Sequence, residues 1–199
     1  MNHFVQLLSL RRILPLGLIL LLPAVAHAHV GVEPTSGLAA GLAHPFMGLD
    51  HLCAMMAVGL WAAQRGGRVI WLVPLAFVTV MAAGGVLGMF AISIPFVEPG
   101  ILTSVFVLDV LIAAAVRLPL LTSVILVGFF ALFHGHAHGS ELPSTAAGFT
   151  YALGFLISTI LLHLCGIGLR LSARRYPGTQ PARYVGAAIV ACGLYLSLA

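Results

Sequence analysis

The sequence predicts an all-α membrane protein, a bundle of six transmembrane helices that follows a cleavable signal peptide. Its 199 residues are 61% hydrophobic and only 7% charged, whereas about 25% of the residues of an average soluble domain are charged. The mean hydropathy is +1.12. Six apolar runs follow the N-terminal segment, each near the roughly 20 residues that a helix needs to cross a bilayer core of about 30 Å.

The N-terminal segment has the three parts of a secretory signal. Arg11 and Arg12 precede an apolar run, 13–25, and the sequence Ala-His-Ala that ends at Ala28 forms an A-x-A cleavage site. We therefore expect residues 1–28 to be a signal peptide. An uncleaved signal anchor is the alternative, and it leaves the orientation of the remaining chain unchanged because the two arginines still hold that end inside.

The rest of the chain, residues 29–199, is predicted to form one six-helix transmembrane domain. Glycine and proline pairs such as Gly66-Gly67 and the Pro95 region separate the apolar runs. The connections are short, which favours a single antiparallel bundle. The predicted spans are 38–63, 69–92, 96–116, 119–139, 145–170 and 183–199.

The arginines predict the orientation of the spans. If the mature N-terminus, His29, is periplasmic, the connections after the first, third and fifth spans are cytoplasmic. Every arginine after the signal segment then lies at a cytoplasmic end, as the positive-inside rule requires. These arginines are Arg65, Arg68, Arg117, Arg170, Arg174, Arg175 and Arg183. We expect a multi-pass protein of the bacterial inner membrane with its mature N-terminus and its C-terminus in the periplasm.

Composition also argues against several classes of function. The formal charge of +4 is too sparse for a nucleic-acid-binding surface, so membrane lipid is the expected surrounding. Cys53, Cys165 and Cys192 lack CxxC spacing, which argues against a disulfide framework or a zinc ribbon. The sequence has no Walker motif, so we expect any transport work to use ion gradients or the membrane potential. The oligomeric state is left open.

The first span opens with a group of polar residues in the segment HPFMGLDH, which begins at His44. His44 and His51, seven residues apart, would differ by only about 20° around a helix, so both imidazoles are expected to face one cavity. Asp50 lies about 100° from His51 and could bind a cation or orient an imidazole. An aspartate beside a histidine in an apolar helix is costly unless paired, which favours function over histidines that only form interfacial hydrogen bonds.

The fourth span closes with the histidine-rich segment FHGHAHGSE. On a helix, His134, His138 and Glu141 fall within about 60° of one another, whereas His136 points to the opposite side and is only a possible additional ligand or pathway residue. A solvated loop that picks up metal incidentally is the alternative, but the regular spacing favours a ligand face.

Small residues at four-residue spacing predict where helices approach each other closely. On the second span these are Gly84 and Gly88, and on the fourth Gly135 and Gly139.

The predicted topology brings the two polar segments to the same side of the membrane, because the first span runs inward and the fourth runs outward. The predicted metal ligands are His44, Asp50, His51, His134, His138 and Glu141. These imidazole and carboxylate donors suit Ni²⁺, Co²⁺, Zn²⁺ or Cu²⁺. His29 could add an α-amine and an imidazole, or it could belong to an unstructured tail. Cys53 is predicted to be a packing residue. Its sulfur could also bind copper, so copper stays among the candidate ions.

Two motifs resemble those of a known family. The segments His44-Pro45-x-x-Gly48-x-Asp50-His51 and Phe133-His134-Gly135-x-Ala137-His138-Gly139-x-Glu141 are similar to the signatures of the HupE/UreJ family of nickel/cobalt permeases. The resemblance covers the chain from about residue 27 to the end. It implies a secondary transporter rather than an enzyme, a nickel or cobalt substrate without a resident cofactor, and a role in supplying nickel for hydrogenase or urease. The family pattern leaves position 136 variable.

Two further ionisable residues lie deeper in the predicted bundle. Asp109 on the third span and His163 on the fifth fall at similar levels in the cytoplasmic half, where an ionisable group is a candidate for function. We expect either a second stage of an ion pathway or an ordinary hydrogen bond between helices.

Two other classes of function stay open on the residues alone. A membrane-embedded metalloenzyme would use the same donors, although the sequence lacks an HExxH motif. A metal-binding sensor or chaperone would bind the ion without transporting it.

Overall fold

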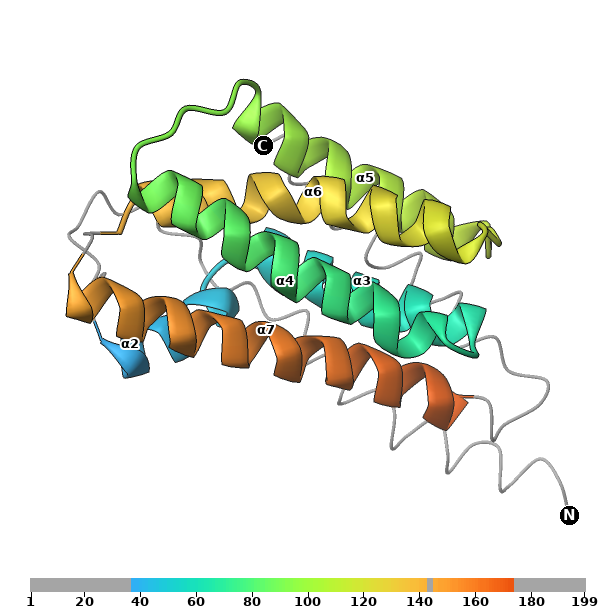
Figure 1. The fold of residues 1–199 in the computed structure, drawn as a ribbon. Coiled ribbons are helices and arrows are strands. Elements are labelled where there is room, and N and C mark those ends of the chain that lie inside the picture. Colours follow the sequence, from blue (N-terminus) through green and yellow to red (C-terminus); the bar gives the residue numbers. More distant parts are fainter. Residues whose placement is uncertain (1–36, 143–144, 174–199) are drawn as a thin grey trace, which may run out of the picture. The chain divides into compact units, whose positions relative to one another are not determined.

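The computed structural model describes residues 37–142 and 145–173, which lie within the unit Val32–Ala199 of the chain. Every regular element in these two ranges is helical (Figure 1). In chain order they are α2 (Leu38–Ala43), the 3-10 helix η1 (His44–Phe46), α3 (Leu49–Arg65), α4 (Val69–Met89), α5 (Val97–Ala113), α6 (Leu120–Ser140) and α7 (Ala146–Ala173). The predicted signal peptide, His29 and the span predicted at 183–199 lie outside the described residues.

Helices confirm three of the predicted spans, and the chain is a membrane protein by their length and composition. In the described ranges, α4, α6 and α7 are each long and apolar enough to cross a bilayer, and the bent pair of Leu38–Phe46 with His51–Arg65 would make a fourth span. Helix α5 has 17 residues, so it is about 25 Å long, less than the thickness of a typical hydrocarbon core.

The first predicted span is broken, contrary to the expectation of one continuous helix. The chain bends by 78° between Leu38–Phe46 and His51–Arg65. Pro45 lies in the first turn of η1 and has no N–H to continue the hydrogen-bond ladder of α2. Gly48 then takes an extended backbone conformation and caps α3. The prediction that His44 and His51 share a face of one helix was therefore wrong, because a helical periodicity does not continue across the break.

Helices α4 and α6 touch backbone to backbone, so each glycine pair lies at a close helix contact as predicted, and the structure shows that the two helices are each other's partner. A Cβ atom at Gly135 would lie 1.9 Å from the carbonyl oxygen of Met81, and one at Gly139 would lie 2.0 Å from that of Gly85. Any larger residue would force the two helices apart. This contact fixes which face of α6, and so which of its histidines, turns toward the rest of the bundle.

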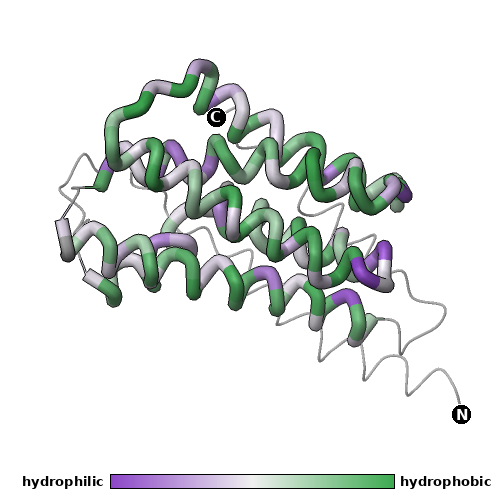
Figure 2. Tube along the Cα trace, in the orientation of Figure 1, coloured by the Kyte–Doolittle hydropathy of each residue, from purple (hydrophilic) through white to green (hydrophobic). Residues whose placement is uncertain are grey.

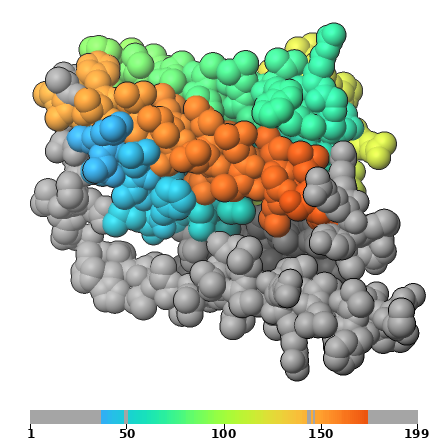
Figure 3. All heavy atoms as spheres, turned by 90° about the horizontal axis from the view of Figure 1, so that it is seen from below, coloured from blue at the N-terminus to red at the C-terminus, as the bar shows by residue number. Residues whose placement is uncertain are grey.

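Helix α7 packs against α2 and α3 in the same way (Figure 3). A Cβ atom at Gly59 of α3 would lie 2.0 Å from the carbonyl oxygen of His163, and one at Gly166 would lie 2.2 Å from that of Met56. Large apolar side chains fill the remaining space between the helices, with Trp61 and Phe77 fully buried. Helix α3 thus lies in contact with α4, α5 and α7.

The described arginines gather at one end of the bundle, here called the arginine end, where α3 and α7 finish. Arg65 donates to the carbonyl oxygen of Leu118 between α5 and α6, and Gln64 Nε2 donates to that of Ile112 at 3.3 Å. Figure 2 shows hydrophilic residues at the α3–α4 turn and mostly apolar residues along the helices. The opposite end, where η1 meets the start of α3 and the end of α6, holds the histidines and is called the histidine end.

Candidate metal site at the histidine end

Four imidazole rings from three elements lie together at the histidine end. They are His44 from η1, His51 from α3, and His134 and His138 from α6. The ring centroids of His51 and His138 are 4.5 Å apart, and those of His44 and His138 are 4.9 Å apart. His134 lies 5.6 Å from His51, centroid to centroid, and His44 lies 6.2 Å from His51. The fold therefore assembles all four predicted imidazole ligands, although 94 residues separate the first from the last (138 − 44).

The closest approach in this histidine cluster joins two ring nitrogens. His51 Nε2 and His138 Nε2 are 2.5 Å apart. A cation bound by both nitrogens at about 2.1 Å each would hold them about 3 Å apart, so a small separation would admit it. Among the described residues, no group of three or more His, Cys, Asp and Glu side chains has an arrangement that could hold a metal ion as it stands. The cluster therefore offers two converging nitrogens with two further rings beside them.

A serine on α5 sets the orientation of His134. Ser104 Oγ lies 2.8 Å from His134 Nε2 and donates its own proton to the carbonyl oxygen of Ile101 at 2.6 Å. The hydrogen bond between the serine hydroxyl and the ring nitrogen holds the imidazole in one orientation. Partners that orient histidine ligands in this way are common at metal sites.

Replacing Ser104 by alanine is expected to weaken metal binding about 10-fold, because partners that orient histidine ligands usually contribute 10- to 100-fold. Isothermal titration of the detergent-solubilised protein with Ni²⁺ would measure the change. Ser158→Ala is the matched control, since its hydroxyl donates to the Leu42 carbonyl oxygen. Equal affinities in the two variants would contradict the role given to Ser104.

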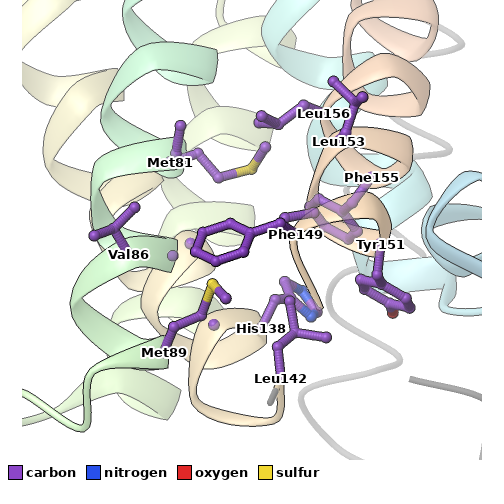
Figure 4. A pocket seen from close by; sticks show the side chains of 15 residues that line it. Met81, Val86, Met89, His138, Leu142, Phe149, Tyr151, Leu153, Phe155 and Leu156 are labelled. Carbon is purple, nitrogen blue, oxygen red and sulfur yellow. The ribbon is translucent and has the colours of Figure 1, made fainter. Parts of the chain in front are cut away.

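Aromatic side chains of α7 cover the cluster. The ring of Phe155 lies 4.6 Å from that of His138, and the ring of Tyr151 lies 5.8 Å from that of His44. His138 also lines a cavity of about 240 Å³ between α4, α6 and α7, where it lies near Met89 and Leu142 (Figure 4). The other lining side chains are almost all apolar, so His138 borders both the polar cluster and a low-dielectric space.

The other predicted ligands differ in their positions. Asp50 lies in the first turn of α3, and its side chain is outside the described part of the structure. Glu141 is exposed at the C-cap of α6, one residue beyond the end of the helix at Ser140, and its place on the ligand face stays a prediction. His136 Nε2 donates to the Ile92 carbonyl oxygen at 2.8 Å, away from the cluster as its helical angle predicted.

The two deeper residues are buried. Asp109 is 2% exposed and His163 is 1% exposed. Within the described ranges, Asp109 Oδ1 and both ring nitrogens of His163 have no hydrogen-bond partner. The ordinary interhelical hydrogen bond that the sequence left open for His163 is therefore not formed with any described residue.

Sequence reasoning did not find Ser104, Tyr151 and Phe155. Each is an ordinary residue of an apolar span, and its partner lies on a helix distant in sequence. Only a contact between α5 and α6, or between η1 and α7, gives these side chains a role.

Comparison with known proteins places the chain in a family. The model of the HupE / UreJ protein family matches residues 17–196. The chain belongs to the HupE/UreJ family. It is also 49% identical over 177 residues to Protein HupE of Rhizobium leguminosarum bv. viciae, covering 89% of this chain and 92% of that protein.

The family is of the transporter type and is associated with nickel and cobalt transport. The resemblance read from the two histidine motifs is thus confirmed. No solved structure matches the chain.

Proposed function

We propose that this HupE/UreJ protein is a secondary permease that carries a divalent transition-metal ion, Ni²⁺ or else Co²⁺, across the bacterial inner membrane into the cell. The convergence of His51 Nε2 and His138 Nε2 at one end of a membrane bundle carries the proposal. Nickel is preferred over zinc or copper because of the family and not because of the donor set, which suits all four metals.

The ion would be caught at the histidine end and released at the arginine end. His44 and His134 would turn toward the ion held between the two converging nitrogens, with Asp50 supplying a carboxylate from the first turn of α3. Glu141, which is exposed at the histidine end, would attract the hydrated cation. Water would complete the coordination, because a transport site must bind loosely enough to release its ion.

The polarity of the bundle supports an inward direction. Arg65, Arg68, Arg117 and Arg170, the arginines of the described ranges, lie at the end opposite the histidines, and positive-inside topology assigns that end to the cytoplasm. A divalent cation that moves toward a negative interior gains about 4.6 kcal/mol per 100 mV, twice the value for a single charge. Inward transport would therefore need no nucleotide hydrolysis.

Uptake into proteoliposomes tests the proposal. The purified full-length protein is reconstituted, an inside-negative potential is imposed, and entry of Ni²⁺, Co²⁺, Zn²⁺ and Cu²⁺ is followed in time against protein-free liposomes. We expect potential-driven entry of Ni²⁺ or Co²⁺. Stoichiometric binding without flux would refute the permease and favour a sensor or chaperone, and metal-dependent turnover without flux would favour a metalloenzyme.

A further inference from the structure

An isolated imidazole lies inside the bundle beyond the histidine cluster. His163 of α7 is 1% exposed, and neither of its ring nitrogens has a hydrogen-bond partner among the residues that the structure describes. Burying a polar group without a partner is costly, so the positions where it occurs call for an explanation. An imidazole kept ready to bind a passing ligand is one such explanation.

Phe77 links this imidazole to the cluster. Its ring lies 5.9 Å from the ring of His134 and 5.1 Å from that of His163, edge to face in the second case. Phe77 is fully buried. One aromatic ring thus packs against both a member of the cluster and the deeper histidine.

The depth of His163 follows from its contact with α3. His163 packs against Gly59, which lies eight residues beyond His51 and so about 12 Å farther along the helix. Gln64 of α3 bonds to Ile112 of α5, one turn after Asp109. Gly59, the contact of His163, lies five residues before Gln64, and Asp109 lies three residues before Ile112. Asp109 and His163 therefore lie within about one helical turn of the same depth.

We propose that His163 is an inner binding station for the transported divalent cation, which reaches it from the histidine cluster by displacement of the Phe77 ring. The proposal rests on the permease function proposed above. An imidazole nitrogen suits Ni²⁺ and Co²⁺, and the carboxylate of Asp109 at the same depth offsets part of the cost of a cation there. Two stations of moderate affinity also let an ion leave more readily than one tight site does.

Flux and binding measured on the same variants test the proposal. The wild-type protein should bind two equivalents of Co²⁺, the tighter one at the histidine cluster and the weaker one at His163. His163→Leu should lower the initial rate of Ni²⁺ uptake at least about 10-fold, and Co²⁺ titration of the solubilised variant should keep the tighter equivalent and lose the weaker one. Thr159→Val is the matched control, because Thr159 is equally buried on α7 but donates to the Phe155 carbonyl oxygen of its own helix. That variant should keep both flux and stoichiometry. Wild-type flux in His163→Leu would overturn the inner station.

A second variant covers the case in which His163→Leu does not fold. Phe77→Trp enlarges the ring that packs against both histidines and should slow uptake while leaving the tighter Co²⁺ equivalent intact. Unchanged uptake would overturn the proposed path. If the wild-type protein gives no flux of any ion, the permease function fails. The inner station is then decided by whether the weaker Co²⁺ equivalent is present and disappears in His163→Leu or, if that variant does not fold, in His163→Gln.

Discussion

Replacing His51 by alanine is expected to reduce the initial rate of Ni²⁺ uptake into proteoliposomes about 100-fold or more, beyond the effect of losing a partner that only orients a ligand. His51 has the largest effect because it contacts three rings of the cluster, those of His44, His134 and His138. It also supplies one of the two converging nitrogens. Its loss removes the point at which the ion would be held.

The control for this prediction is another imidazole of the same histidine-rich end. His136→Ala removes a ring that bonds to the Ile92 carbonyl oxygen instead of lying in the cluster, and its uptake should stay within about twofold of wild type, as expected for a side chain away from the site. Uptake is normalised to the amount of protein in each liposome preparation. Normal uptake by His51→Ala, or an equal loss in both variants, would refute the assignment of the site.

Replacing Gly135 by alanine is expected to lower the free energy of unfolding by about 3 kcal/mol, the upper end of the usual range for overpacking. The added Cβ atom would lie 1.9 Å from the Met81 carbonyl oxygen and 2.9 Å from the Gly85 nitrogen. Both obstacles are backbone atoms, which cannot rotate away as a side chain can. Helix α6 must therefore move away from α4, and much less protein should accumulate in the membrane.

Gly128→Ala is the matched control on the same helix. A Cβ atom there meets only Val80 Cγ2, at 3.5 Å, so the better helix propensity of alanine should stabilise the protein by up to about 1 kcal/mol. Thermal unfolding in detergent, followed by circular dichroism, compares the two variants. Equal melting temperatures would show that the α4–α6 contact does not hold the bundle together.

The bundle itself was largely predictable from the sequence, because its main determinants are local. A run of about 20 apolar residues between breakers is sufficient to predict a membrane helix, and α4, α6 and α7 follow the predicted spans closely. The glycine spacing predicted that α4 and α6 would each approach a neighbour closely, since it depends only on the period of each helix, but not that the two would meet each other. The same helical period predicted that His136 would point away from the face that holds His134 and His138.

The site was predictable only as a set of residue types at one end of the bundle. The histidine motifs predicted four imidazoles on the same side, and the fold brings them together. The prediction that His44 and His51 come together by sharing one face of a helix was wrong in its reason, because Pro45 and Gly48 break the helix between them. Glu141 lies at the C-cap of α6, and its place on the ligand face stays a prediction.

The sequence by itself determined the membrane helices, the separation of histidines from arginines, and the donor types that a metal ion would meet. Only the tertiary structure decided that His51 Nε2 meets His138 Nε2, that Ser104 bonds to His134, and that the Phe77 ring packs against both His134 and His163. The physical reason is that helical periodicity fixes directions within one helix. Which faces then meet depends on glycine contacts between helices distant in the chain and on the bend at the start of α3.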